Sequence, residues 1–106
     1  MAQTKQRIVF MFVNPDVDPV KHRATMALGS AELLIVGTRN YDHAVEVSKE
    51  LAKEGVAAIE LCAGFGNIGV ARVTEAVKGV PIGVVRFDSH PVFQGQTGDQ
   101  MVGIIP

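Results

Sequence analysis

Four short apolar runs recur along the chain, and segments with helical spacing separate them. The runs, rich in Val and Ile, cover residues 8–13, 33–36, 56–61 and 82–87. Each is nearly continuous and lacks a clean alternation of apolar and polar residues. This pattern is typical of strands buried on both faces, as in a parallel sheet.

Apolar residues at helical spacing predict three helices, over residues 19–28, 41–54 and 67–78. Capping residues support the first two starts, since Asp18 and Asn40 are good N-caps. Glycines suit the ends, with Gly29, Gly55 and Gly79 directly after the three predicted helices.

The predicted order alternates strand and helix, which indicates an α/β domain with right-handed crossovers. The short crossover between the last two runs predicts that residues 56–61 and 82–87 form adjacent, parallel strands. We expect a four-stranded, mainly parallel sheet with flanking helices in two or three layers, flavodoxin-like or Rossmann-like, with a half-barrel as the alternative. The tail over 91–106 reads as a loop ending in an apolar patch at 101–105. That patch suits an edge strand or an arm onto a second subunit.

The length of 106 residues is right for one domain spanning 1–106. Apolar residues make up 47% and charged residues 20%, which is a globular composition. The mean hydropathy of +0.23 is high for so small a chain. We therefore expect a homo-oligomer, with the tail or a helix face in the contact.

The net charge is −1 and the Lys and Arg residues are scattered, so the basic stripe of a nucleic-acid or membrane-surface binder is missing. The lone Cys62 excludes an internal disulfide, and the first apolar run is too short for a secretion signal. These features favour the cytoplasm.

Ligands of parallel α/β sheets bind at the carboxyl ends of the strands. Asn14 follows the first run, and the third is followed by a G-x-G-x-x-G motif made of Gly64, Gly66 and Gly69, with Asn67 inside it. Such a turn at a helix start offers free N–H groups to an anion. A nucleotide or dinucleotide is possible there but is not favoured, because a dinucleotide needs a larger sheet. The alternative is that the glycines bind nothing and only allow the backbone to turn.

The fourth run leads into Asp88 and His90, candidates for acid–base chemistry. Cys62 precedes a predicted helix start and is a candidate nucleophile, with a small apolar filler as the alternative. Glu60 and Arg86 are charges inside apolar runs, which suggests an ion pair on one face or contact with a ligand. No ligand spacing supports a metal site, although Asp88, His90 and Glu60 would be its candidates.

The stretches IELCAGFG at 59–66 and VVRFD at 84–88 resemble a family of small, uncharacterised bacterial α/β domains of about this length. The resemblance covers most of the chain and implies that the two strand-end segments belong together. It implies no activity.

These observations lead to one expectation and one alternative. We expect a small phosphate- or carboxylate-bearing metabolite to bind at the strand ends, with or without chemistry from Asp88, His90 or Cys62. The alternative is a non-catalytic oligomeric subunit or protein-interaction module.

Overall fold

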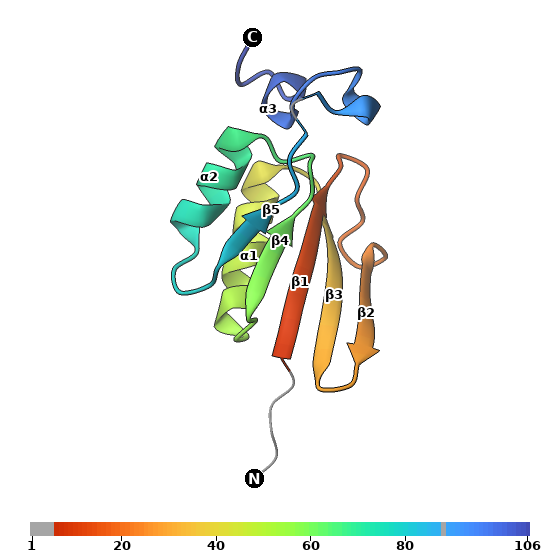
Figure 1. The fold of residues 1–106 in the computed structure, drawn as a ribbon, viewed down its shortest axis with the longest axis vertical. Coiled ribbons are helices and arrows are strands. Elements are labelled where there is room, and N and C mark those ends of the chain that lie inside the picture. Colours follow the sequence, from red (N-terminus) through yellow and green to blue (C-terminus); the bar gives the residue numbers. More distant parts are fainter. Residues whose placement is uncertain (1–5, 88) are drawn as a thin grey trace.

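The computed structural model describes residues 6–87 and 89–106. Its core is a five-stranded sheet in the order β2-β3-β1-β4-β5, in which only β2 runs antiparallel to its neighbour (Figure 1). The elements in chain order are β1 (Gln6–Val13), β2 (Arg23–Leu28), β3 (Ala31–Thr38), α1 (Tyr41–Lys53), β4 (Ala58–Leu61), α2 (Asn67–Ala76), β5 (Ile82–Val84), a 3-10 turn η1 (Pro91–Phe93) and α3 (Gly98–Met101). The α/β class is as expected, with one strand more than predicted.

The helix predicted over 19–28 is wrong, because that segment forms a turn and then the edge strand β2. Asp18 does act as a cap, since its carboxylate accepts the N–H groups of Val20 and Lys21, but only one turn follows. From Arg23 onward the chain is extended and pairs with β3. Gly29, taken as a helix cap, has φ +58° and opens the two-residue loop of a β2–β3 hairpin, a place that favours glycine.

Both long helices lie on one face of the sheet, behind the strands in Figure 1. The chain crosses from β3 to β4 and then from β4 to β5 in the same direction along the sheet. Right-handed crossovers that advance in one direction place their helices on the same face. A helix between β1 and β3 would advance the other way and cover the opposite face, but β2 takes its place. The flavodoxin-like or Rossmann-like arrangement, with helices on both faces, is therefore not formed.

The four predicted strands and the two later helices are present, although β5 is shorter than the run predicted over 82–87. β4 and β5 are adjacent and parallel, as the short crossover suggested. Helix α1 starts where expected, and the side chain of Asn40 accepts the N–H of His43 at 2.8 Å. Gly55 follows it with φ +81°, a conformation that glycine adopts without strain.

The main core lies between the sheet and the two helices. Val9 and Met11 of β1 form its centre, and both are fully buried. Alternate residues of the neighbouring strands point to the same side, and the helices contribute Leu51 and Val73. This two-layer packing holds the carboxyl ends of four strands in fixed positions at the top of Figure 1.

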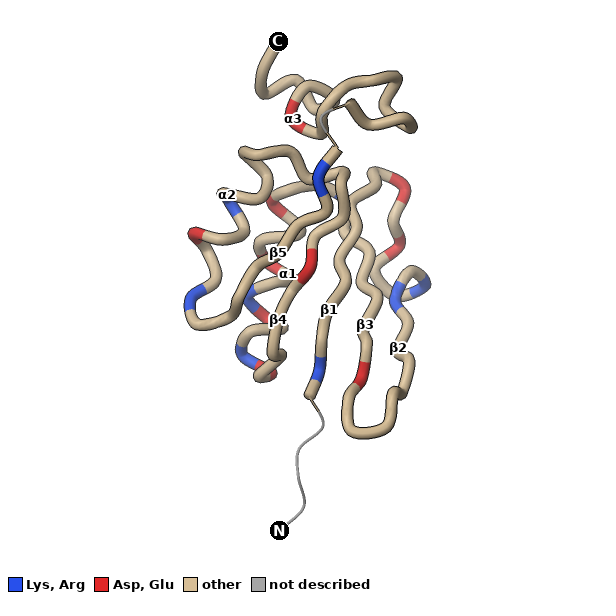
Figure 2. Tube along the Cα trace, viewed as in Figure 1, with Lys and Arg blue, Asp and Glu red and all other residues tan. Residues whose placement is uncertain are grey.

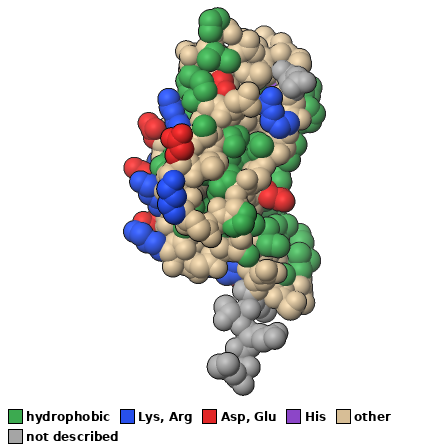
Figure 3. Space-filling model, turned by 60° about the vertical axis from the view of Figure 1, so that its left-hand side comes forward, with side chains coloured by type: hydrophobic (Ala, Val, Ile, Leu, Met, Phe, Trp, Pro, Cys, Tyr) green, Lys and Arg blue, Asp and Glu red, His purple; other side chains and the backbone are tan. Residues whose placement is uncertain are grey.

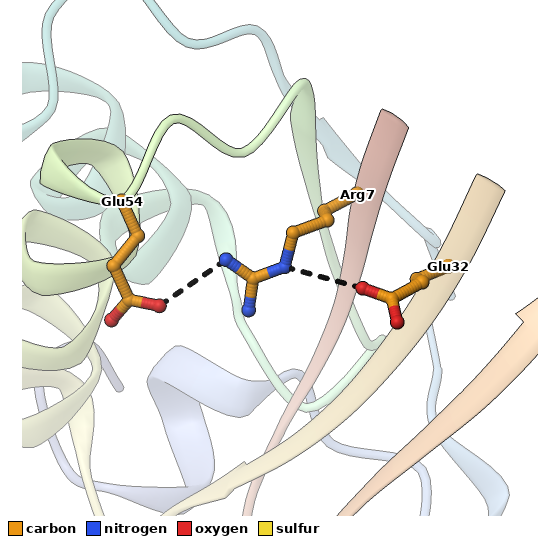
Figure 4. Close-up of polar contacts among 3 residues, drawn as sticks. All are labelled: Arg7, Glu32 and Glu54. Carbon is orange, nitrogen blue, oxygen red and sulfur yellow. Dashed lines mark hydrogen bonds and ion pairs between the residues drawn. The ribbon is translucent and has the colours of Figure 1, made fainter. Parts of the chain in front are cut away.

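Many of the charged residues lie on the helices α1 and α2, and others lie in the loop between β1 and β2 (Figure 2). At the opposite end of the sheet from the strand carboxyl ends, Arg7 of β1 lies between Glu32 of β3 and Glu54 after α1 (Figure 4). Its guanidinium is 3.7 Å from the Glu32 carboxylate and 3.3 Å from that of Glu54. These partly exposed pairs connect the sheet to the end of α1. Within 6–87 and 89–106, no helix has the length and apolar character to cross a bilayer.

Candidate functional site

The carboxyl ends of the strands are covered by the chain's own C-terminal segment, residues 91–106 (Figure 1). The segment contains η1 and α3 and does not form the edge strand that its apolar patch suggested. Ile104 packs against the core. Helix α3 is stabilised by a capping box, in which Thr97 and Gln100 exchange hydrogen bonds.

Asp99 of α3 is the anchor of this segment. Its side chain is almost completely buried, and the Tyr41 hydroxyl donates a hydrogen bond to its Oδ1 at 3.1 Å. The same hydroxyl accepts the N–H of Gly66 at 3.1 Å. Tyr41 thus connects the start of α1, the glycine-rich turn and the C-terminal segment through one oxygen atom.

The Asp99 carboxylate also occupies the amino end of α2. It accepts the N–H of Ile68 at 2.9 Å and that of Gly69 at 3.3 Å. Free N–H groups and the helix dipole stabilise a negative charge at this position. The glycine-rich turn therefore does bind a carboxylate here, and that carboxylate belongs to the chain itself.

Close packing, rather than positive φ, explains the glycines of this region. The φ of Gly66 is −75°. A Cβ at Gly66 would overlap the Asp99 carboxylate, and one at Gly69 would overlap the Tyr41 ring. A Cβ at Gly98 would overlap the carbonyl oxygen of Gly64. The glycines allow the C-terminal segment to approach the turn closely.

Burial raises the pKa of Tyr41 to about 12. The N–H of Gly66 opposes this shift, because it stabilises the phenolate, whereas the nearby Asp99 carboxylate adds to it. Tyr41 is therefore a neutral hydrogen-bond donor at physiological pH.

A cavity of about 230 Å³ lies between the strand ends and the C-terminal segment. The floor comes from the ends of β1 and β3 and from the glycine-rich turn, and the cover comes from η1 and α3. The lining residues fall into two groups by origin, with Val13, Asn14, Pro15, Arg39, Asn40, Tyr41 and Gly64 in the floor and Phe93, Gly98, Met101 and Val102 in the cover. Most of the wall is apolar.

The polar side chains of this wall offer hydrogen-bond donors. The Oδ1 of Asn14 already accepts the N–H of Asp16 at 2.8 Å, and the Oδ1 of Asn40 caps α1. Their amide NH₂ groups are what these residues can present to a ligand. Arg39 adds a guanidinium, which is a donor only. The polar residues that line the cavity therefore have hydrogen-bond donors in their side chains.

Of the residues expected to bind a ligand, Asn14 and Gly64 line this cavity. Gly66, Asn67 and Gly69 belong to the α2 start, where Asp99 lies. The Sγ of Cys62 accepts the N–H of Gly64 at 3.3 Å and is not part of the cavity wall.

His90 lies one side chain away from the cavity. Its ring stacks on Phe93 with centroids 4.3 Å apart, and Phe93 forms the wall. The Nδ1 of His90 accepts the N–H of Val92 at 3.1 Å, so only Nε2 is available for other contacts. Asp88, its expected partner, lies outside the described residues.

The expected placement of Glu60 and Arg86 on one face of two neighbouring strands is wrong, because Arg86 does not belong to a strand. Glu60 lies beside Phe10 and Gly83 in the sheet, and β5 ends at Val84, before Arg86. Glu60 is exposed on the sheet face that carries no helix.

Three important residues were not identified as site residues from the sequence: Tyr41, Arg39 and Asp99. The helical spacing of residues 41–54 places Tyr41 in an apolar stripe, and Arg39 is one of several polar residues that follow the second apolar run. For Asp99 a signal existed, because Thr97 and Gln100 have the spacing of a capping box, which predicts a helix start. Nothing local in the sequence indicates that this helix would reach the glycine-rich turn.

Fold and cavity together define a two-layer α/β domain whose strand ends are covered by its own C-terminal segment. The chain belongs to a family of unknown function, DUF6506, whose model matches residues 6–100. This agrees with the resemblance seen in the sequence. No curated protein matches the chain.

Proposed function

We propose that this protein binds a small molecule with a carboxylate or phosphate group in the cavity at the strand ends. The observation that carries the proposal is the wall itself, where Arg39 and the amide groups of Asn14 and Asn40 provide donors beside an apolar surface. A guanidinium is well suited to the paired oxygens of such anions. The ligand's anionic group lies near Arg39 and its apolar part near Phe93 and Met101.

The size of the cavity restricts the ligand. Sites for drug-sized molecules usually measure about 300–1,000 Å³, and this one is smaller. A compact monocarboxylate or a small phosphate ester fits that volume better than a nucleotide does. The anion contacts Arg39 and not the start of α2, because the Asp99 carboxylate uses the N–H groups there.

Binding without chemistry is the simpler form of this proposal. Among the described residues that line the cavity, only Arg39 and Tyr41 are ionisable. Tyr41 is held by Asp99 and Gly66, and its raised pKa makes it a poor base. Cys62 and His90 do not line the cavity, so neither the nucleophile expected at Cys62 nor the acid–base chemistry expected of His90 is part of the proposal.

The test is a thermal-shift series with sodium butyrate, benzoate, phenyl phosphate and inorganic phosphate. A ligand that binds only the native state raises the melting temperature, and at a given ligand concentration the shift is larger for the tighter-binding ligand. We expect benzoate or phenyl phosphate to stabilise the protein more than inorganic phosphate does, because only they fill the apolar part of the cavity.

Arg39→Gln removes the guanidinium, and we expect it to abolish the shift while the unliganded melting temperature stays close to wild type. Arg72→Gln is the matched control, since Arg72 is an exposed arginine of α2 that does not line this cavity. Equal shifts in both variants, or none with any of the four anions in the wild type, would contradict the proposal.

A further inference from the structure

One face of the sheet has no layer over it. In the register of the strands, Ile8, Phe10 and Phe12 of β1 point away from the helices, together with Leu33 and Ile35 of β3. The edge strand β2 adds Ala24, Met26 and Leu28 to the same side. We call this surface the open sheet face.

The open sheet face is mainly apolar. Its β1 and β3 side chains are only half-buried, and Met26 and Leu28 are each 53% exposed. Among the described strand residues on this side, Glu60 is the only charged one. Figure 3 shows the contrast, with most charged side chains gathered on the helix side and hydrophobic ones on the strand side.

The topology explains why this face is apolar. Parallel strands with helices on both sides are buried on both faces and carry continuous apolar runs. Here β1 and β3 have such runs, but β2 replaces the helix that would cover their second face. β1 and β3 therefore have the composition of strands that are covered on both faces, but no described element of this chain covers their second face.

We propose that a second copy of this chain provides that layer, so that the protein is a homodimer packed through its open sheet faces. A flat apolar face is complementary to itself, as a two-fold interface requires. Sheets that stack in this way interdigitate their side chains about 10 Å apart. Among the described strand residues of this face there is no cation that would attract an anionic partner, and only one carboxylate that would attract a basic partner. The surface that suits this face is therefore another apolar surface.

The area of the face agrees with a dimer. Strands lie about 4.8 Å apart and rise about 3.3 Å per residue, so the sheet presents about 20 by 25 Å, or about 500 Å² per copy. Two copies then bury about 1,000 Å², which is the lower limit for a specific interface. The apolar tail at 101–105, which we first expected in the contact, is smaller, and its Met101 and Val102 line the cavity.

The test is sedimentation equilibrium of the wild-type chain between about 1 and 100 μM, a range that covers micromolar dissociation constants. We expect twice the monomer mass of 11.3 kDa at the higher concentrations. Phe10→Lys places a charge at the centre of the face and should raise the dissociation constant about 30-fold or more. Thr74→Lys, an exposed position on α2, is the matched control and should dimerise like wild type.

Circular dichroism of each variant establishes that the fold is intact, and Ile35→Lys provides a second substitution on the same face. A monomer at every concentration overturns the proposal. A dimer that survives both Phe10→Lys and Ile35→Lys overturns it as well, because the contact must then lie elsewhere. Loss of dimer in Met101→Lys alone would assign the contact to the tail.

Discussion

The hydroxyl of Tyr41 and the carboxylate of Asp99 are 58 residues apart in the chain and 3.1 Å apart in the structure. Tyr41 begins α1, and Asp99 belongs to the C-terminal segment that covers the cavity. Because the carboxylate also accepts two N–H groups at the start of α2, this pair joins the cover of the cavity to its floor. The proposed binding site depends on that connection.

Replacing Asp99 should destabilise the protein. Asp99→Ala leaves the Tyr41 hydroxyl and the N–H groups of Ile68 and Gly69 without their acceptor, and we expect a loss of about 2–3 kcal/mol in the free energy of unfolding. Urea denaturation followed by circular dichroism measures it. Asp16→Ala, which removes an exposed carboxylate, should change the free energy by less than about 0.5 kcal/mol. Similar values for the two variants would show that Asp99 anchors nothing.

The titration of Tyr41 can be observed directly, because it is the only tyrosine. We expect tyrosinate absorbance of the folded protein to have its midpoint at about 12, against 10.0 for an unperturbed tyrosine. The raised pKa means that the contribution of the neutral hydroxyl to stability is complete below pH 10 and is lost as the pH rises to about 12. Asp99→Asn should lower the midpoint, since it removes the negative charge beside the hydroxyl. A folded-state midpoint near 10 would contradict the buried hydrogen bond.

The close approach of the C-terminal segment predicts a specific intolerance. Gly98→Ala forces a Cβ into the carbonyl oxygen of Gly64, which is backbone and cannot rotate away. We expect a loss of about 1–3 kcal/mol and faster proteolysis after residue 90. Gly83→Ala is the control, because its Cβ would meet nothing nearer than Glu60 Cγ at 3.9 Å. If both variants are cleaved at the wild-type rate, the segment is not held by this contact.

The ion pairs of Arg7 should contribute little. Arg7→Met keeps most of the aliphatic stem and removes the charge between Glu32 and Glu54, both of which are partly exposed. We expect a loss of about 0.5–1 kcal/mol at low salt that decreases in high salt, because solvent and ions screen such pairs. Thermal melts at two salt concentrations measure this, and a loss that is independent of salt would indicate packing instead.

Local sequence determined the parts of the fold that depend on neighbouring residues. Asn40 and Gly55 delimit α1 because capping involves groups within one helical turn. The apolar runs predicted four of the five strands, and the short connection between β4 and β5 predicted that they pair. The anion-binding character of the α2 start also follows locally, since it arises from the helix's own N–H groups.

Tertiary structure decided the identity of β2, because residues 19–28 fit two periods. Ala24 and Leu28 lie on one side of a helix, and Ala24, Met26 and Leu28 lie on one side of a strand. The hydrogen bonds to β3 favour the strand over the helix, and they form only when the chain turns back at Gly29. The number of layers, and with it the open sheet face, follows from that single choice.

The carboxylate at the α2 start was likewise decided by tertiary structure. The sequence predicts an anion at the glycine-rich turn, but a local pattern does not specify where the anion comes from. Asp99 lies 30 residues beyond Gly69 and reaches it only because the C-terminal segment folds back over the strand ends. Contacts between segments that are distant in the chain depend on how the whole domain packs, so the local periodicity of the sequence does not predict them.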